Sequence, residues 1–237
     1  STFYKRIELL ICSFKYSSMF NNNFKLQEAF QLHQQQRYAE AELIYSQIIQ
    51  GGGIVDVQVF MNLADVLNRQ GKYKEVLNAI NQGLEMLNGN AQLRLLKSQM
   101  QFQNNDLAGA KSNVSLLIDD IPSMGEAHYV LGNICLQENN LDQAFTAFEK
   151  SVELLPQLAE GHYNLGMIYY SRKETDKAGK KWQDALALQP NLLPALLNLG
   201  NSAIEANLYN KAIEYLEKVL TIDPNHYSAI KMIGMSY

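Results

Sequence analysis

One spacing constrains this chain more than any other feature of its sequence: four of its five prolines recur at a constant interval. The same interval separates a set of alanines and a set of glycines, and a looser form of it links Ala41, Val76 and Ala110. Three residue classes that share one period, of about 34 residues, predict tandem copies of a single structural unit. The residues that carry the period are Pro122, Pro156, Pro190 and Pro224; Ala110, Ala144, Ala178 and Ala212; and Gly132, Gly166, Gly200 and Gly234.

The content of one period indicates two antiparallel helices. A polar stretch over residues 171–176 separates two apolar groups and suits a tight turn between helices. Pro190 has no amide hydrogen, so it ends the second helix and precedes the next unit. The two groups follow helical spacing: His162, Leu165, Gly166 and Tyr169 in the first helix, and Ala178, Trp182 and Ala185 in the second.

Small residues recur where two helices must approach each other closely, with axes roughly 8–10 Å apart. On the first helices these are Ala29, Ala64, Ser98, Gly132, Gly166, Gly200 and Gly234, and on the second helices Ala41, Ala110, Ala144, Ala178 and Ala212. We expect bulky side chains opposite them, namely Tyr45, Ile80, Val114, Phe148, Trp182 and Leu216.

This pattern resembles the tetratricopeptide repeat family over about residues 22–237, and segments such as 162–166 and 212–218 are similar to its consensus. The resemblance implies an all-α fold, a right-handed solenoid (superhelix) of antiparallel helix pairs. We divide the chain into repeats at residues 22–56, 57–90, 91–124, 125–158, 159–192 and 193–226, with a truncated seventh at 227–237.

The N-terminal repeats depart from the family pattern. Val76 stands where alanine is expected and Gly83 where alanine is common, which we interpret as a size exchange on one helix face. The third repeat is the least typical, because Arg94 and Lys97 lie in its first helix. The first repeat ends in three glycines, residues 51–53, instead of a proline.

Both ends of the array need cover, because each repeat buries its face only against its neighbours. Residues 1–21 place Phe3, Ile7, Leu10 and Phe14 on one helical face, which predicts a capping helix. A disordered tail or a partner-binding helix are the alternatives. At the other end, Ile230, Ile233, Gly234 and Tyr237 begin a seventh repeat without a polar cap. We expect the natural chain to continue there, or this edge to support self-association.

Composition excludes some classes of function. The 237 residues carry 20 Lys and Arg against 24 Asp and Glu, a net charge of -4 without a basic run, which argues against nucleic-acid binding. No apolar stretch approaches the roughly 18 residues of a membrane-spanning helix. Two distant cysteines, Cys12 and Cys135, favour a reducing compartment. We expect a cytoplasmic protein, with a periplasmic one as the alternative.

We find no catalytic or metal-binding pattern, and we predict no cofactor, no metal and no enzymatic activity in this chain. His128 and His162 occupy equivalent helix-packing positions in two successive repeats. Asp119 and Asp120 precede a proline, where a solvated turn is the simpler interpretation. The glycines at residues 51–53 lack the Lys and Ser or Thr of a phosphate-binding loop.

Binding is better supported, because the first helices of such an array line one concave surface. Asparagine amides on these helices can donate to and accept from the backbone of an extended peptide. The row of asparagines is interrupted by Leu96, Val130 and Met232. The candidate peptide-binding residues are Asn62, Asp65, Tyr129, Asn133, Tyr163, Asn164, Asn198 and Asn201.

This row is similar to the asparagine-lined superhelix of the O-linked N-acetylglucosamine transferases. It does not resemble the family's carboxylate clamp, which needs Lys and Arg on successive first helices. We therefore predict a non-catalytic scaffold that binds a protein or peptide segment. The alternatives are the N-terminal substrate-recruiting part of a larger enzyme, such as a glycosyltransferase, and an oligomeric assembly or secretion scaffold.

Overall fold

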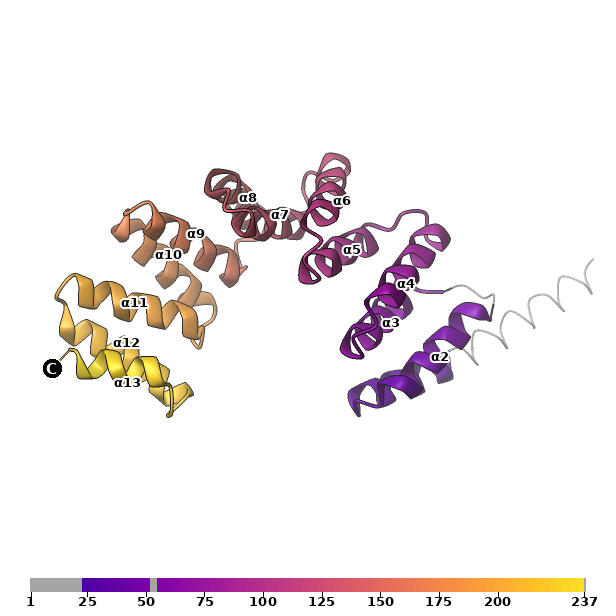
Figure 1. The fold of residues 1–237 in the computed structure, drawn as a ribbon, viewed down its shortest axis with the longest axis horizontal. Coiled ribbons are helices and arrows are strands. Elements are labelled where there is room, and N and C mark those ends of the chain that lie inside the picture. Colours follow the sequence, from indigo (N-terminus) through magenta and orange to yellow (C-terminus); the bar gives the residue numbers. More distant parts are fainter. Residues whose placement is uncertain (1–22, 52–54, 237) are drawn as a thin grey trace, which may run out of the picture. The chain divides into compact units, whose positions relative to one another are not determined.

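The computed structural model describes residues 23–51 and 55–236, and all regular secondary structure in these ranges is helical (Figure 1). A helix over residues 23–34 is followed by α2 (Tyr38–Gln50), α3 (Val57–Arg69), α4 (Tyr73–Met86), α5 (Ala91–Gln103), α6 (Leu107–Asp120), α7 (Gly125–Gln137), α8 (Leu141–Leu154), α9 (Ala159–Ser171), α10 (Thr175–Leu188), α11 (Leu193–Glu205), α12 (Tyr209–Ile222) and α13 (Tyr227–Gly234). Successive helices fold back on each other, so the predicted all-α fold of antiparallel pairs is confirmed.

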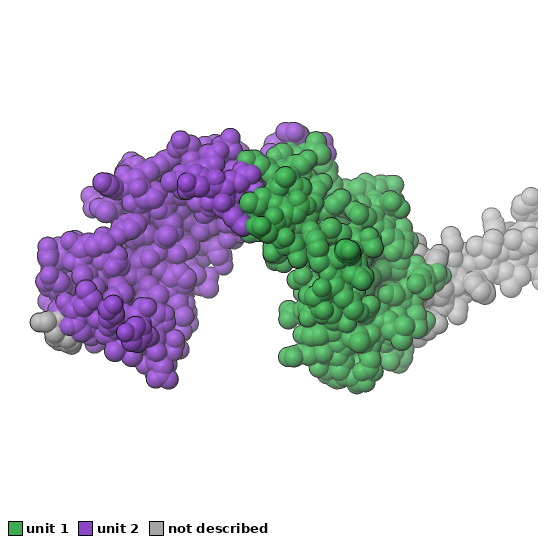
Figure 2. Space-filling model, viewed as in Figure 1, with its two compact units in different colours: residues 1–117 green, residues 118–237 purple. Residues whose placement is uncertain are grey.

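The chain divides into two compact units, residues 1–117 and residues 118–237 (Figure 2). We refer to them as unit 1 and unit 2 and describe each by itself. The proposed capping segment, Cys12, and Gly52 and Gly53 lie outside the described residues. In the part of the chain that the structure describes, no helix is both long and apolar enough to cross a membrane.

The turn inside each helix pair adopts the same backbone conformation throughout unit 1 and unit 2. One residue per turn adopts a left-handed conformation with φ between 58° and 73°: Gln36, Gly71, Asn105, Asn139, Lys173 and Asn207. The following amide donates to a carbonyl five residues earlier, as from Glu174 to Tyr169 at 2.9 Å. This bond satisfies a carbonyl that the helix end leaves without a partner. Asn and Gly tolerate this backbone, whereas Gln36 and Lys173 adopt it at a cost.

Each helix pair is joined by a small residue and a large one that follows it by 16 positions. A Cβ atom on Gly132 would lie 2.6 Å from the ring of Phe148, and one on Gly200 would lie 2.9 Å from Leu216. A Cβ on Gly166 would likewise collide with the indole of Trp182. All six predicted fillers are at most 1% exposed: Tyr45, Ile80, Val114, Phe148, Trp182 and Leu216. The predicted packing of small against large residues is therefore confirmed.

The periodic prolines stand just beyond the second helices. The helices α8, α10 and α12 end at Leu154, Leu188 and Ile222, two residues before a proline in each case. His128 Nε2 donates to the carbonyl of Pro122 at 2.9 Å, and His162 Nε2 donates to that of Pro156 at 3.0 Å. These histidines therefore tie α7 and α9 to the turns that precede them.

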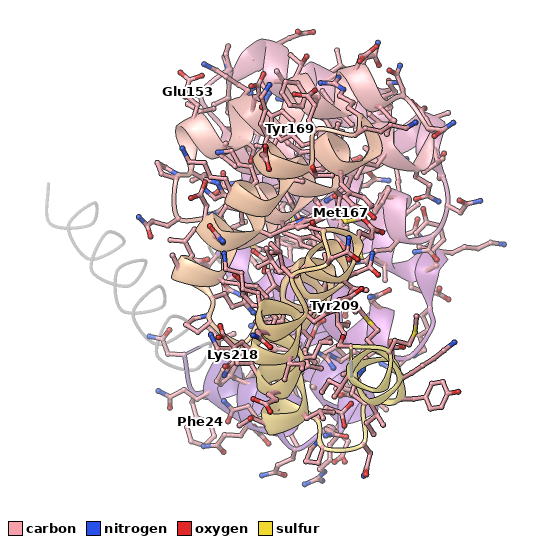
Figure 3. The ribbon with its side chains drawn as sticks, turned by 90° about the vertical axis from the view of Figure 1, so that its left-hand side faces the viewer. Phe24, Glu153, Met167, Tyr169, Tyr209 and Lys218 are labelled. Carbon is pink, nitrogen blue, oxygen red and sulfur yellow. The ribbon has the colours of Figure 1, made fainter. Side chains whose placement is uncertain are left out.

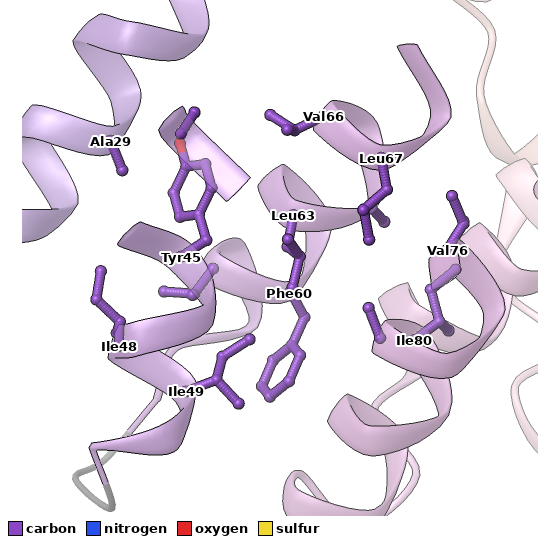
Figure 4. Close-up of a cluster of buried hydrophobic side chains, with 14 of the residues drawn as sticks. Ala29, Tyr45, Ile48, Ile49, Phe60, Leu63, Val66, Leu67, Val76 and Ile80 are labelled. Atoms are coloured by element: carbon purple, nitrogen blue, oxygen red, sulfur yellow. The ribbon is translucent and has the colours of Figure 1, made fainter. Parts of the chain in front are cut away.

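The core of unit 1 shows how a departure from the repeat pattern is accommodated (Figure 4). A Cβ on Gly83 would lie 2.8 Å from Phe60 and 2.7 Å from Leu93, so the missing side chain makes room for residues of α3 and α5. Val76, at the position where alanine is typical, is fully buried. The space left at Gly83 is thus filled from α3 and α5, and the size exchange between Val76 and Gly83 stays a prediction.

Candidate functional site

The first helices of unit 2 carry a polar face between their buried residues. On α9, Glu160, Tyr163, Asn164 and Met167 follow one another at intervals of three, one and three residues, which places them on one side of the helix. The same spacing on α7 and α11 presents Tyr129, Asn133, Asn198 and Asn201. We call Asn133, Tyr163, Asn164, Met167, Asn198 and Asn201 the amide face.

A hydrogen bond between two predicted site residues joins α7 to α9. The Nδ2 of Asn164 donates to the Oδ1 of Asn133 at 3.1 Å, and both side chains are half-buried. The amides therefore hold each other in a defined orientation. The second N–H of Asn164 is not needed for this bond.

The next bonds join α9 to α11. The Nδ2 of Asn198 lies 3.3 Å from the hydroxyl of Tyr163 and 2.9 Å from the sulfur of Met167. Burial raises the pKa of Tyr163, and the bond from Asn198 partly opposes that rise. Met167 remains 37% exposed (Figure 3). The amide face thus combines oriented amides with an accessible thioether.

The final contact of this series includes two residues that the sequence prediction missed. Asn201 Nδ2 donates to Glu205 at 2.9 Å and lies 3.4 Å from the hydroxyl of Tyr170, which itself donates to Glu205 at 2.6 Å. The bond to Glu205 is the main cause that raises the pKa of Tyr170. The signal in the sequence was spacing, since Tyr170 and Glu205 lie seven residues after Tyr163 and Asn198.

Tyr129 belongs to the core as much as to the surface. Its ring packs on Phe148 with centroids 5.7 Å apart, and it borders the buried cluster around Phe148. The ring is half-buried, so only part of it is available to a ligand.

The two candidate residues of unit 1 have different surroundings. Asn62 accepts from Gln58 Nε2 at 2.8 Å and lines a small apolar hollow of about 260 Å³ with Leu26, Gln27 and Phe30. Burial raises the pKa of the neighbouring phenol of Tyr45, and the amide of Asn62 partly opposes that rise. Asn62 therefore has both a structural partner and an exposed hollow beside it.

Asp65 is engaged within the protein. Its Oδ2 accepts from His33 Nε2 at 2.8 Å and from Arg69 Nε at 2.9 Å. The Arg69 guanidinium also lies over the ring of Tyr38, 5.9 Å from its centroid. Both partners bond to Oδ2, and the side chain of Asp65 remains 43% exposed, so its place in a peptide site stays a prediction.

The described residues contain no group of three or more His, Cys, Asp and Glu placed to hold a metal ion. A hollow of about 650 Å³ does lie between α10, α11 and α12, lined by Lys180, Gln183, Lys211 and Tyr215 among others. Its lining mixes both charges with apolar carbon and contains none of the predicted site residues.

Solved structures with the same fold come from several proteins. PilF of Pseudomonas aeruginosa matches with a TM-score of 0.76 and 15% identity, covering 92% of this chain and 99% of that one. A chain of the Cut9–Hcn1 heterotetramer of the APC/C matches with a TM-score of 0.72 and 16% identity over 94% of this chain, which spans only 46% of that one. YrrB, a TPR protein with an unusual peptide-binding site, matches with a TM-score of 0.58 and 20% identity, covering 79% of this chain and 96% of that one.

Family models identify the repeat itself. No curated protein matches the sequence significantly. Models of the TPR repeat match residues 132–172, and models of the tetratricopeptide repeat match residues 159–192 and 194–226. All three matches fall within unit 2. With the sequence period, the helix pairs and these matches in agreement, the chain is a tetratricopeptide repeat protein.

Proposed function

We propose that this chain is a non-catalytic scaffold that binds an extended polypeptide segment on the amide face of unit 2. One observation supports the proposal above all: side-chain bonds between α7, α9 and α11 hold a row of asparagines in fixed orientations. Oriented donors and acceptors bind a ligand with less loss of conformational entropy than mobile ones.

The amides retain unused hydrogen-bonding groups. Each of Asn164, Asn198 and Asn201 donates from Nδ2, and their Oδ1 atoms have no partner among the described residues. An extended peptide exposes both N–H and C=O groups and therefore matches this set. Such bonds are made to the backbone, so they select little by sequence.

The test begins with a random peptide library selected on the immobilised full-length chain. We expect Asn164→Ala combined with Asn198→Ala to weaken binding of the selected peptides roughly tenfold, the value of two modest hydrogen bonds. The matched control is Asn81→Ala combined with Asn210→Ala, which removes two exposed amides from second helices. Equal affinity for the wild type and the first variant would contradict the proposal.

Self-association is a second candidate, favoured by the C-terminal helix. In α13 only Ala229 is buried, while Tyr227 is 76% and Ile230 50% exposed, and a Cβ on Gly234 would contact nothing within 4 Å. A second copy that covers this face would raise the sedimentation coefficient with concentration. Ile230→Gln should abolish that rise, whereas Leu208→Gln, at a side chain of similar exposure, should not. A coefficient independent of concentration in the wild type excludes this candidate.

A further inference from the structure

The charges of unit 2 are separated between its two kinds of helix. The helices α7, α9 and α11 contain no Lys or Arg, and each carries one glutamate: Glu126, Glu160 and Glu205. All nine basic side chains of unit 2 lie on second helices, in turns or on α13: Lys150, Arg172, Lys173, Lys177, Lys180, Lys181, Lys211, Lys218 and Lys231. The surface that carries the amide face is therefore anionic, although unit 2 as a whole contains many cations.

These glutamates share the helical faces that carry the candidate site residues. Glu126 precedes Tyr129 by three residues and Asn133 by seven, and Glu160 stands in the same relation to Tyr163 and Met167. On α11, Glu205 bonds directly to Asn201. Each carboxylate is thus within one or two helical turns of the amides.

The carboxylates are available to a ligand. Glu126 and Glu160 are exposed and have no ion-pair partner among the described residues. Glu205 is exposed too and bonds to the neutral groups of Tyr170 and Asn201, while it also lines the hollow that Lys180 and Lys211 border. By contrast, Lys177 on α10 pairs with Glu174, and Lys181 pairs with Asp184.

From this charge separation, and resting on the proposed function, we infer that the segment bound by the amide face is basic. Lys or Arg side chains of the segment meet Glu126, Glu160 and Glu205, while its backbone bonds to the asparagines. The aliphatic stems of Lys and Arg suit contact with Met167 and the ring of Tyr163. An acidic segment is repelled, because a charge of the same sign near the surface raises the free energy of the complex.

A segment recognised by its terminal carboxylate does not fit this surface. Such recognition requires a cation or a set of backbone amides that receive the anion. Helices α7, α9 and α11 provide no cationic side chain, and their glutamates oppose any anion that approaches the amides.

The test uses the random peptide library selected on the full-length wild-type chain. We expect the selected peptides to contain more Lys and Arg than Asp and Glu, relative to the unselected library. The triple variant Glu126→Gln, Glu160→Gln and Glu205→Gln should bind them about tenfold more weakly, as expected for a few exposed ion pairs. The matched triple variant Glu149→Gln, Glu214→Gln and Glu217→Gln makes the same change of charge on second helices and should bind as the wild type does.

The outcomes separate the two proposals. If the peptides lose affinity on Asn164→Ala with Asn198→Ala but show no basic excess and no response to the glutamate variant, the charge inference is wrong and the proposed function stands. If they bind the asparagine variant as tightly as the wild type, the proposed function fails. A fall of affinity with rising salt that is absent in the Glu126, Glu160 and Glu205 variant supports the charge inference directly.

Discussion

Unit 1 and unit 2 use the same helix pair but line their first helices with different chemistry. In unit 2, neutral amides and phenols bond from helix to helix, as Asn198 does to Tyr163. In unit 1, the corresponding contact joins His33 to the carboxylate of Asp65, which also pairs with Arg69 on its own helix. Helix α5 of unit 1 also carries Arg94 and Lys97, whereas α7, α9 and α11 carry no cation. The difference teaches that the repeat determines where side chains point and leaves their chemistry free.

The two units also differ in the small residue at which their helix pairs pack. Unit 2 places glycine against a large residue, as in Gly166 and Trp182. Unit 1 has alanine or serine at the small position, as in Ala64 against Ile80, both fully buried. The family models match only within unit 2, where the small residue is glycine.

The largest expected effect comes from transferring one pair between the units. Gly166→Ala should cost about 1–3 kcal/mol by overpacking, because the new methyl collides with Trp182. Trp182→Ile should cost about 3 kcal/mol by leaving a cavity. The double variant reproduces the pair of unit 1 and should be less destabilised than the two losses added together. Chemical denaturation measures all three.

Gly234→Ala is the control for that cycle. No atom lies within 4 Å of its added methyl, so we expect a change within about 0.5 kcal/mol. Strict additivity of the two changes at residues 166 and 182 would show that the pair is not a transferable element.

The next largest effect is on peptide binding, which we compare between a substitution in unit 2 and one in unit 1. Asn198→Ala alone should weaken binding of the selected peptides by about 0.7 kcal/mol, the net value of one modest hydrogen bond. Asn62→Ala should weaken them by less, because Asn62 faces the apolar hollow beside Phe30. Isothermal titration of the peptides into both variants measures these affinities. Equal losses of affinity would mean that Asn62 of unit 1 also contributes to peptide binding.

A smaller effect is expected from pH. The bond to Glu205 raises the pKa of Tyr170 above that of the unfolded chain, near 10. Its stabilisation is therefore complete below about pH 10 and is lost as the pH rises through the folded pKa. Tyr170→Phe should lower the free energy of unfolding by about 1 kcal/mol at neutral pH. The difference from the wild type should become smaller at alkaline pH. Unfolding free energies of both proteins between about pH 8 and 11 provide the comparison. A constant difference between them would contradict the role of the phenol.

The smallest effect concerns the turns, with one test in each unit. Lys173→Gly and Gln36→Gly should each stabilise by about 0.5–1 kcal/mol, because glycine adopts a positive φ without the Cβ clash. Asn139→Gly should change less, since asparagine already tolerates this backbone. Melting temperatures rank the stability of the three variants. An equal gain in stability at all three positions would mean that flexibility of the turn, and not relief of the Cβ clash, causes the effect.

The sequence period was sufficient to predict the helix pairs and the buried fillers, because both depend on residues within one repeat. It did not predict which polar side chains meet. The bonds on the first helices join residues 31, 32 or 35 positions apart, as in Asn164 with Asn133, His33 with Asp65 and Tyr170 with Glu205. These offsets depend on the rotation between neighbouring repeats, which spacing alone does not specify. Spacing therefore did not reveal that His33 and Arg69 both bond to Asp65, which we had assigned to a ligand.

The left-handed turn with its recurring amide-to-carbonyl bond has a consequence for how such a chain can grow. Because the turn recurs with little change from Asn139 to Asn207, duplication of one whole period keeps the spacing between each small residue and its large partner. An insertion of a few residues inside a helix would instead shift each small residue away from its large partner. Genes of this kind are therefore expected to lengthen by whole units, and each copy of residues 159–192 would add one more asparagine, the equivalent of Asn164, to the amide face.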